Sequence, residues 1–590
     1  MCLRCFVVND IKKSVARSIT QILPAPKITH RSLAPEAMLS SPGDWIYFAE
    51  GGKHVIFRHR DVETANTSSK CNASIDHFVL RIRKSDLAAA AVHHHPDSLR
   101  VYHYYKLAEI KGSTSSTERF DRLILEPSLG IYLDVHRTLV LPASFCAHLY
   151  QATISTNVIP SSRLPSWTTE SQCDVTNVDQ INATLLRNHT RLKLHKLSPI
   201  SCKTIRSITM SVEIKPKGGY LATSPLVLPA HRCKFSHSRY YLQQQLMERG
   251  FVRKGWHRNE ESDTASNQQV FTRSSYSPLD LFSGNFAKMS GALKELSKSM
   301  QNNFRVWCDG DQIFGEYETL AQTKYQELLI RVLGTKDHNP NITADAKSTL
   351  LDLIVSVVAT VLDRETLLEG LLSLQLLDAI DGDGAVLVYR RLVSLCGGSQ
   401  SEVEKALEQH YLLRDESFLS TTSLDGNSTR DILVSSPYQL PECPHLHKLL
   451  NESAEFRSLL HIRQEAVLDS EGSFFNTFHS SCCRHVKHLS KQACIYLLSN
   501  WLLSLTMCDV SFFVTFHLSA CSEIDETISE IHEPKQTQGS GGWFVCKWDS
   551  TSCITKALVQ YEIKVIDCDP KPVAKLRSRE DVEKMFQFCS

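Results

Sequence analysis

One apolar stretch, residues 494–516, limits the folds open to this chain more than any other segment. Its length and composition could suit a membrane span, but Asn500 and Asp509 interrupt it, and a central Asp costs about 2.5 to 3.5 kcal/mol in a bilayer. The pattern also changes midway. Residues 497–505 have the apolar spacing of a buried helix, whereas 510–516 are β-branched and aromatic. We therefore expect a helix, a short turn at Asp509 and a strand, with no membrane span.

The overall composition is that of an ordinary globular protein, with 42% apolar and 22% charged residues. A chain of 590 residues has room for two or more domains. Because 65 Lys and Arg balance 64 Asp and Glu, nothing in the net charge calls for a nucleic-acid partner. The 19 cysteines are odd in number and irregularly spaced, and the N-terminus does not resemble a signal peptide. We expect an intracellular protein of the cytoplasm or nucleus, or both.

The pattern along the chain suggests an N-terminal extension (1–40), a sheet-rich region (41–205) and a larger, mainly helical region (206–590) with a polar insertion at 414–490. Strands are expected at 45–48, 55–57, 78–82, 123–125, 139–141, 304–308, 312–314, 510–516 and 558–566. Asp309 and Gly310 form the favoured two-residue turn of a hairpin. Helices are expected at 85–91, 102–110, 239–249, 287–299, 316–333, 348–362, 365–378 and 487–505.

Residues 211–219 read Ser-Val-Glu-Ile-Lys-Pro-Lys-Gly-Gly and place charges at alternate positions. In an extended segment, Glu213, Lys215 and Lys217 would share one face at a spacing of roughly 7 Å, which suits phosphate groups. The alternative is a solvated strand edge, since Pro216 removes a backbone donor and edge strands tolerate proline.

This nonapeptide resembles the EIKPK signature of the inositol-pentakisphosphate 2-kinases, which make inositol hexakisphosphate from ATP. Other segments resemble family motifs in the same order. Residues 45–57 are similar to the family's loop over ATP, with Glu50, Gly51 and Gly52 at its turn, although a Gly-Gly hairpin is common by itself.

The resemblance implies further ATP-binding residues, namely Arg81, Asn188, His189, Glu213 and Arg305. An arginine offers a planar fork of donors to phosphate oxygens. Without the resemblance, Arg81 would be an exposed strand residue as readily as a ligand, and His189 a solvated loop residue.

The same resemblance assigns the catalytic positions to Asp509, which would orient the substrate hydroxyl and accept its proton, and to Lys215. Asp567 is the implied Mg²⁺ ligand, with Asp569 as a second candidate, because oxygen ligands suit that ion. The implied inositol phosphate ligands are Lys217, Arg239, Asn302, Asn303, Lys571, Lys575 and Arg579. A basic C-terminal surface is the alternative for the last three.

Several positions depart from the family pattern. Asp86 and Thr168 stand where arginines are expected, and Gln243 and Met247 replace a histidine and a lysine. These changes remove positive charge near the expected substrate. The zinc site of plant members is also missing, because Leu387 replaces its first histidine and Cys396 lacks a CxxC partner. No structural zinc is expected.

The resemblance therefore implies an α+β, two-lobed, monomeric kinase that uses ATP with Mg²⁺ to phosphorylate the 2-hydroxyl of inositol 1,3,4,5,6-pentakisphosphate. Two alternatives stay open. One is a catalytically degenerate protein that binds inositol polyphosphates, and the other is a kinase for a lower inositol phosphate, which would fit the lost positive charge.

Overall fold

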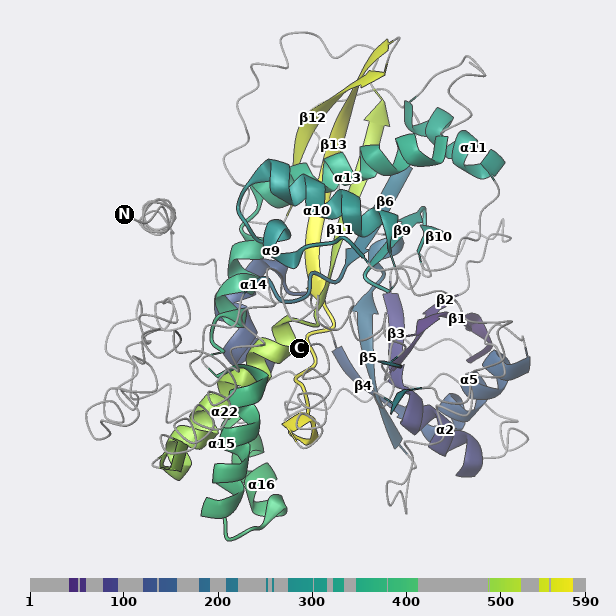
Figure 1. Cartoon of the computed structure of the whole chain (residues 1–590). Helices are drawn as coiled ribbons and strands as arrows, with labels where there is room; N and C mark the ends of the chain where they lie inside the picture. The colour runs from purple at the N-terminus through teal and green to yellow at the C-terminus, as the bar shows by residue number, and fades with distance from the viewer. Residues whose placement is uncertain are drawn as a thin grey trace, which may run out of the picture.

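The computed structural model describes residues 42–50, 54–59, 78–93, 120–134, 137–155, 180–191, 208–220, 251–252, 257–258, 274–300, 302–315, 322–333, 346–378, 380–411, 486–487, 489–520, 541–550 and 553–576. Over these ranges the chain combines helices with antiparallel sheets, which agrees with the α+β prediction. Figure 1 shows two separate sheets, and helices pack beside each of them.

The smaller sheet of the described residues has five strands in the order β1-β2-β3-β5-β4. Its strands are β1 (Trp45–Glu50), β2 (His54–His59), β3 (Phe78–Arg83), β4 (Arg137–Pro142) and β5 (Gln180–Arg187). Side chains at alternate positions, such as Val55 and Phe57, bury one face of this sheet. Two helices, α2 (Lys84–His93) and α5 (Ala143–Ser155), complete a core that is distinct from that of the larger sheet.

The larger sheet has six described strands in the order β10-β9-β6-β11-β13-β12. Its strands are β6 (Ile208–Ile214), β9 (Phe304–Cys308), β10 (Asp311–Phe314), β11 (Ser511–Ala520), β12 (Gly541–Ser550) and β13 (Cys553–Ile566). The predicted turn between β9 and β10 is confirmed, since Asp309 and Gly310 both have positive φ. The strands β7 (Phe251–Val252) and β8 (His257–Arg258) form a separate two-stranded sheet.

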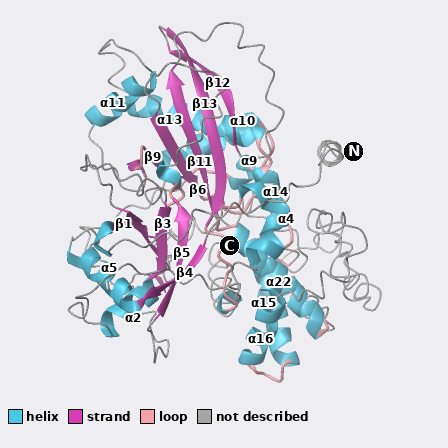
Figure 2. Ribbon diagram, turned by 180° about the vertical axis from the view of Figure 1, so that it is seen from behind, coloured by secondary structure: helices cyan, strands magenta, loops and turns pink. Residues whose placement is uncertain are grey.

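The described helices from α9 onward fall into two groups (Figure 2). Those near the larger sheet are α9 (Pro278–Leu281), α10 (Phe286–Lys298), α11 (Gln322–Leu333) and α13 (Ala346–Arg364). The others are α14 (Leu367–Gln375), α15 (Asp381–Leu395), α16 (Gln400–Tyr411) and α22 (Lys491–Met507), and α22 packs against the other three.

Helix α22 confirms the interpretation of the long apolar stretch as helix, turn and strand. The Ser490 side chain accepts from the Ala493 N–H and caps the helix, which ends at Met507, and β11 starts at Ser511. Its apolar residues are buried on nearly every side, as expected for a helix inside a large protein. Among the described helices, none is both long enough and apolar enough to span a membrane.

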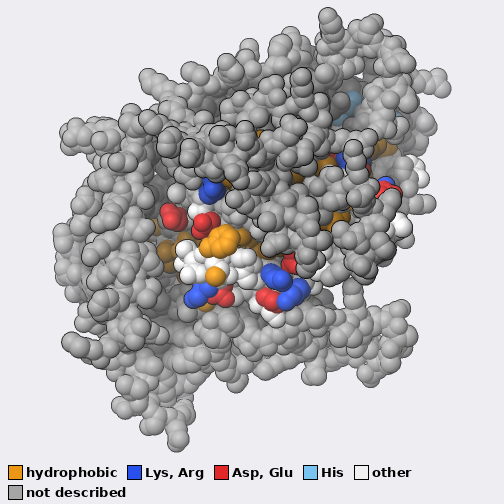
Figure 3. Space-filling model, turned by 90° about the horizontal axis from the view of Figure 1, so that it is seen from above, with side chains coloured by type: hydrophobic (Ala, Val, Ile, Leu, Met, Phe, Trp, Pro, Cys, Tyr) orange, Lys and Arg blue, Asp and Glu red, His pale blue; other side chains and the backbone are white. Residues whose placement is uncertain are grey.

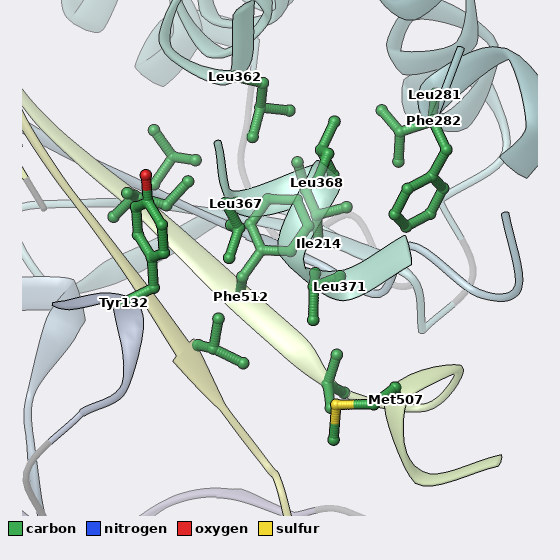
Figure 4. Close-up of a cluster of buried hydrophobic side chains, with 14 of the residues drawn as sticks. Tyr132, Ile214, Leu281, Phe282, Leu362, Leu367, Leu368, Leu371, Met507 and Phe512 are labelled. Atoms are coloured by element: carbon green, nitrogen blue, oxygen red, sulfur yellow. The ribbon is translucent and has the colours of Figure 1, made fainter. Parts of the chain in front are cut away.

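The core of the larger sheet is formed mainly by leucine, valine and aromatic side chains. Figure 4 shows Leu367 and Leu371 of α14 beside Ile214 of β6 and Phe512 of β11, with Met507 near them. This packing fixes α14 against the sheet and brings its C-terminal end close to the end of α22.

One early segment packs in the core of the larger sheet. It comprises η4 (Asp121–Leu125), α4 (Glu126–Leu129) and η5 (Gly130–Tyr132). Leu133 pairs with Val565 in an isolated bridge next to it. The segment therefore fastens the first half of the chain to β13.

Two expectations from the sequence need correction. Residues 123–125 form a π-type helical turn and not a strand, because a short buried apolar run has no periodicity that separates the two. The described residues after 206 are mainly helical, as expected, although they also hold the six-stranded sheet. β6 lies between β9 and β11 and is not a solvated edge. The expected helices 102–110 and 239–249, the extension 1–40 and residues 414–485 lie outside the described residues.

Candidate active site

The charged nonapeptide lies at the end of β6. The strand stops at Ile214, and the backbone reaches the left-handed region at Lys217, where φ is 63°. The expectation that Glu213, Lys215 and Lys217 share one face of a continuous strand is therefore wrong. The three side chains reach three different partners, and this separation distributes the charges of one motif over the whole site.

Glu213 pairs with an arginine on the neighbouring strand. It is the register partner of Arg305 on β9, and Arg305 Nη1 lies 3.5 Å from Glu213 Oε2. Glu213 is buried, and a buried carboxylate needs such a partner. The two residues predicted for ATP binding therefore lie together on adjacent strands.

Asp509 lies in the turn between α22 and β11 and is held by two lysines. Lys217 Nζ lies 3.4 Å from Asp509 Oδ1, and Lys571 Nζ contacts Oδ2. The Lys571 N–H also donates to Thr506 Oγ1 at 3.0 Å, which holds the C-terminal segment against the end of α22. Burial alone would raise the pKa of Asp509, but Lys217 and Lys571 outweigh it and hold that pKa well below its usual range.

A second cluster lies where β13 ends. Asp567 follows the strand with φ 63°, and its carboxylate lies 3.6 Å from Arg81 Nη2 and 3.7 Å from Lys215 Nζ. Asp569 also contacts Arg81, which donates to His54 Nδ1 at 3.2 Å. Burial lowers the pKa of Arg81, and the charge of Asp567 opposes that effect. The cluster joins β3 of the smaller sheet to the end of β13.

A cavity of about 250 Å³ opens beside this second cluster. Its walls come from β3 and β5 of the smaller sheet and from the end of β13. Its lining includes five carboxylates, against two arginines and one histidine. The charged lining residues are His54, Arg81, Arg83, Asp86, Asp121, Asp134, Asp567 and Asp569. Figure 3 shows acidic and basic side chains next to one another on the described surface.

Asn188 and His189 are both buried directly after β5, so the solvated-loop alternative for His189 is wrong. His189 Nε2 donates to Asp134 Oδ2 at 3.0 Å, and the imidazole stacks on Phe513. Asn188 Oδ1 accepts from the hydroxyl and the N–H of Thr190. Burial would raise the pKa of Asp134, but the neighbouring His189 lowers it overall. In this structure both predicted ATP ligands are engaged with neighbouring protein groups.

The remaining predicted ligands are more dispersed. Asn303 is buried, and its carbonyl accepts from the Lys215 N–H at 3.0 Å, whereas Asn302 and Lys575 are exposed. Glu50 ends β1, and its side chain is not described. Four predicted positions lie outside the described residues, namely Gly51, Gly52, Arg239 and Arg579.

Two residues near these clusters were missed from the sequence. Asp134 gives no signal, because it follows a short helical turn with no motif around it. Gln375 lies on the same buried face of α14 as Leu367 and Leu371. A polar side chain at such a position needs hydrogen-bond partners, and this requirement could have identified it. Gln375 has no exposed surface and bonds to the backbone next to both Lys217 and Asp509.

Within the described residues, no group of three or more His, Cys, Asp or Glu side chains is placed to hold a metal ion by itself. Asp567 and Asp569 lie together at the end of β13 and are paired with cations. Mg²⁺ in nucleotide sites uses one or two carboxylates and takes its other ligands from phosphates and water. These two residues therefore fit a metal that arrives with a nucleotide.

The two clusters combine carboxylates that can orient a hydroxyl or hold a metal with cations that can neutralise phosphate. Phosphoryl transfer depends mainly on such positioning and charge neutralisation. The site therefore has the kinds of groups that an enzyme needs to transfer phosphoryl groups.

Comparison with known proteins specifies this class. The family model described as inositol-pentakisphosphate 2-kinase matches residues 47–585, and the chain belongs to this family. It is 29% identical over 232 residues to "Inositol-pentakisphosphate 2-kinase IPK1" of Oryza sativa subsp. indica. It is 30% identical over 219 residues to "Inositol-pentakisphosphate 2-kinase" of Arabidopsis thaliana.

These matches are partial. The rice alignment covers 39% of this chain and 46% of the relative, and the Arabidopsis alignment covers 35% and 42%. The chain thus spans about half the length of the curated relatives it matches.

Proposed function

We propose that this protein is an ATP-dependent kinase that phosphorylates the 2-hydroxyl of inositol 1,3,4,5,6-pentakisphosphate and so makes inositol hexakisphosphate. The observation that carries the proposal is Asp509, held between Lys217 and Lys571 in a member of this family. A protein that only bound polyphosphates would have no need of this carboxylate among its cations, so this arrangement favours an enzyme over a degenerate binder.

In the proposed reaction, the oxygen of the 2-hydroxyl attacks the γ-phosphorus of ATP. The bond from that phosphorus to the β–γ bridging oxygen breaks, ADP leaves, and Asp509 accepts the hydroxyl proton. An Asp whose pKa is strongly lowered is a weak base, so its main contribution is to orient the hydroxyl. When the phosphates attract Lys571 away from Asp509, the carboxylate becomes more basic.

The other cluster serves the nucleotide in this proposal. Lys215 and Arg81 neutralise phosphate charge, and Asp567, with Asp569, holds the Mg²⁺. The ion supplies charge neutralisation at the phosphate oxygens when it is bound. Arg81 and Lys215 are paired with Asp567 in this structure, so nucleotide binding must exchange these contacts for contacts to phosphate.

We further propose a two-lobed organisation, with an ATP-binding lobe at 41–205 and a lobe for the inositol phosphate at 206–590. The two hydrophobic cores, one for each sheet, support this division. The segment 120–133 belongs to the first lobe by sequence, yet it packs with the second. This segment therefore connects the two proposed lobes.

A second candidate is a kinase for a less phosphorylated inositol. Asp86 lines the cavity beside Arg81 and Arg83, where the family resemblance leads us to expect another arginine. A carboxylate there repels a substrate phosphate, so a substrate with fewer phosphates would bind this wall better.

The test is an incubation of purified protein with ATP, Mg²⁺ and inositol pentakisphosphate lacking the 2-phosphate, with products separated by anion exchange. Asp509→Asn should lower turnover by about 10²- to 10⁴-fold and leave ATP binding unchanged. Asp352→Asn is the matched control, because Asp352 forms an exposed pair with Lys294 on the helical surface.

Full activity in Asp509→Asn would reject that residue as the base. A panel of tetrakis- and trisphosphates in the same assay separates the two kinase candidates. Tight binding of inositol hexakisphosphate without turnover of any substrate would support the degenerate binder.

A further inference from the structure

The side chain of Gln375 joins three parts of the candidate active site. Gln375 is the last residue of α14 and is completely buried. Its Nε2 donates to the Lys217 carbonyl at 3.0 Å and to the Met507 carbonyl at 3.1 Å, and its Oε1 accepts from the Gly219 N–H at 2.8 Å. Both amide donors and the acceptor are therefore used.

The three bonds act on the backbone at two sensitive places. Lys217 has a left-handed φ of 63°, which a residue other than glycine adopts only when its surroundings enforce it. Gly218 follows Lys217 directly, and the bonds of Gln375 to the Lys217 carbonyl and the Gly219 N–H hold the backbone on both sides of Gly218. Met507 ends α22 two residues before Asp509. One side chain thus controls the backbone leading to both members of the Lys217–Asp509 pair.

Gln375 is itself held rigidly. The Ser504 hydroxyl donates to the Gln375 carbonyl at 2.6 Å, and the Tyr220 hydroxyl lies 3.2 Å from the same Ser504 oxygen. Tyr220 also donates to Asp378 at 2.8 Å. Leu367 and Leu371 fix α14 in the core of the larger sheet, and this packing fixes the position of Gln375 relative to its partners.

We infer that Gln375 is a positioning residue for phosphoryl transfer, which sets the distance between Lys217 and Asp509 through its bonds to Lys217, Gly219 and Met507. The inference rests on the proposed function. Under this inference Gln375 need not contact the substrate, because it acts only through the backbone of the two charged residues. A displacement of about 1 Å at reacting groups can cost about 10²-fold in rate.

The test compares Gln375→Leu and Gln375→Glu with wild type. The Leu variant removes all three bonds, whereas the Glu variant keeps the length and the acceptor for Gly219 but removes both donors. We expect kcat to fall about 30- to 100-fold in both variants, while KM for ATP stays within twofold. Leu149→Ala is the control, because it truncates a fully buried residue in the core of the smaller sheet, far from these bonds.

A double-mutant cycle gives a result that a purely structural role would not produce. Once Lys217→Ala has removed one member of the pair, Gln375→Leu should lower kcat by a smaller factor than it does in the wild type, because only its effect on Asp509 remains. If the decrease in kcat of the double variant equals the product of the decreases in the two single variants, the inference is overturned. Full activity of both Gln375 variants would also overturn it.

Two further outcomes are decisive. Failure of both Gln375 variants to fold, as judged by circular dichroism, would assign the residue to the fold and overturn the inference. An inactive but folded wild-type protein would refute the proposed function itself and the inference with it. Because wild type is measured in the same series, the two failures are distinguishable.

Discussion

Lys217 Nζ lies 3.4 Å from Asp509 Oδ1, although 292 positions separate the two residues along the chain. The contact arises because β6 and β11 are neighbours in the larger sheet, so the segment that follows β6 meets the turn that precedes β11. Lys571 reaches the same carboxylate from the segment after β13. The order of strands in this sheet therefore assembles the candidate catalytic group.

This cluster predicts a stability that depends on pH. The pKa of Asp509 is depressed in the folded protein, so the stabilisation is present above the ordinary value of 3.8 and is lost as the pH falls through the lower folded value. Asp509→Asn leaves Lys217 and Lys571 without their shared carboxylate. We expect a lower melting temperature than wild type at pH 7 and a difference that narrows below about pH 4.

Thermal unfolding followed by circular dichroism at several pH values measures this difference. Asp352→Asn serves as the control, since its exposed pair with Lys294 contributes little. An equal difference between Asp509→Asn and wild type at every pH would contradict the assignment of the stabilisation to the ionised carboxylate.

Arg81 should matter more for nucleotide binding than the arginine two positions further along the same strand. Arg81→Met removes a buried guanidinium that contacts Asp567 and Asp569, and we expect ATP affinity to fall about 10- to 100-fold. Arg83→Met is the same chemical change at an exposed position of the same cavity, and it should change the affinity less than threefold. Titration with a fluorescent ATP analogue measures both, and equal losses would refute the prediction for Arg81.

Glu365 should contribute to stability through two tyrosines. The Tyr132 hydroxyl donates to Oε2 at 2.9 Å and the Tyr561 hydroxyl donates to Oε1 at 2.8 Å, so one carboxylate joins the segment 120–133 to β13. Burial, and then the charge of Glu365, raise the pKa of both tyrosines. Tyr561→Phe should reduce the free energy of unfolding by about 1.5 to 3 kcal/mol, as for other hydrogen bonds to charged groups.

Urea denaturation measures this loss. Tyr389→Phe is the matched control, because the buried Tyr389 hydroxyl has no hydrogen-bond partner among the described residues. The control should leave the free energy of unfolding unchanged or slightly higher. A similar loss in the two variants would show that Glu365 is not the cause.

Substitution by alanine should have opposite effects on stability at Gly219 and at Gly291. A Cβ atom on Gly219 would overlap the Phe282 ring, so Gly219→Ala must displace either that ring or the backbone that follows Lys217. We expect it to destabilise the protein by about 1 to 3 kcal/mol and to lower turnover. Gly291 is an exposed residue within α10 with open space around it, and Gly291→Ala should stabilise the protein by up to about 1 kcal/mol.

Urea denaturation and the kinase assay follow both glycine variants. Normal activity and stability in Gly219→Ala would mean that Phe282 moves aside freely and that the close packing does not hold the lysine segment in place.

The sequence by itself determined the local elements and the kinds of residue at the site. The helix, turn and strand of 491–520, the hairpin at Asp309 and Gly310, and the strands near Trp45 and Phe78 all follow from periodicity and turn chemistry, which act over a few residues. Resemblance to the motifs of the family identified Asp509, Arg81 and Asp567 as candidates, because these motifs occur in this sequence in the order that the family shows.

Only the tertiary structure decided which charges meet. β6 stops before Lys215, so Lys215 pairs with Asp567 while Lys217 pairs with Asp509, and no strand pattern predicts that division. His189 is buried against Asp134, and Gln375 bonds to segments far from it in sequence. Local patterns carry no information on such contacts, because these depend on strand order and on the requirement that every buried polar group find a partner.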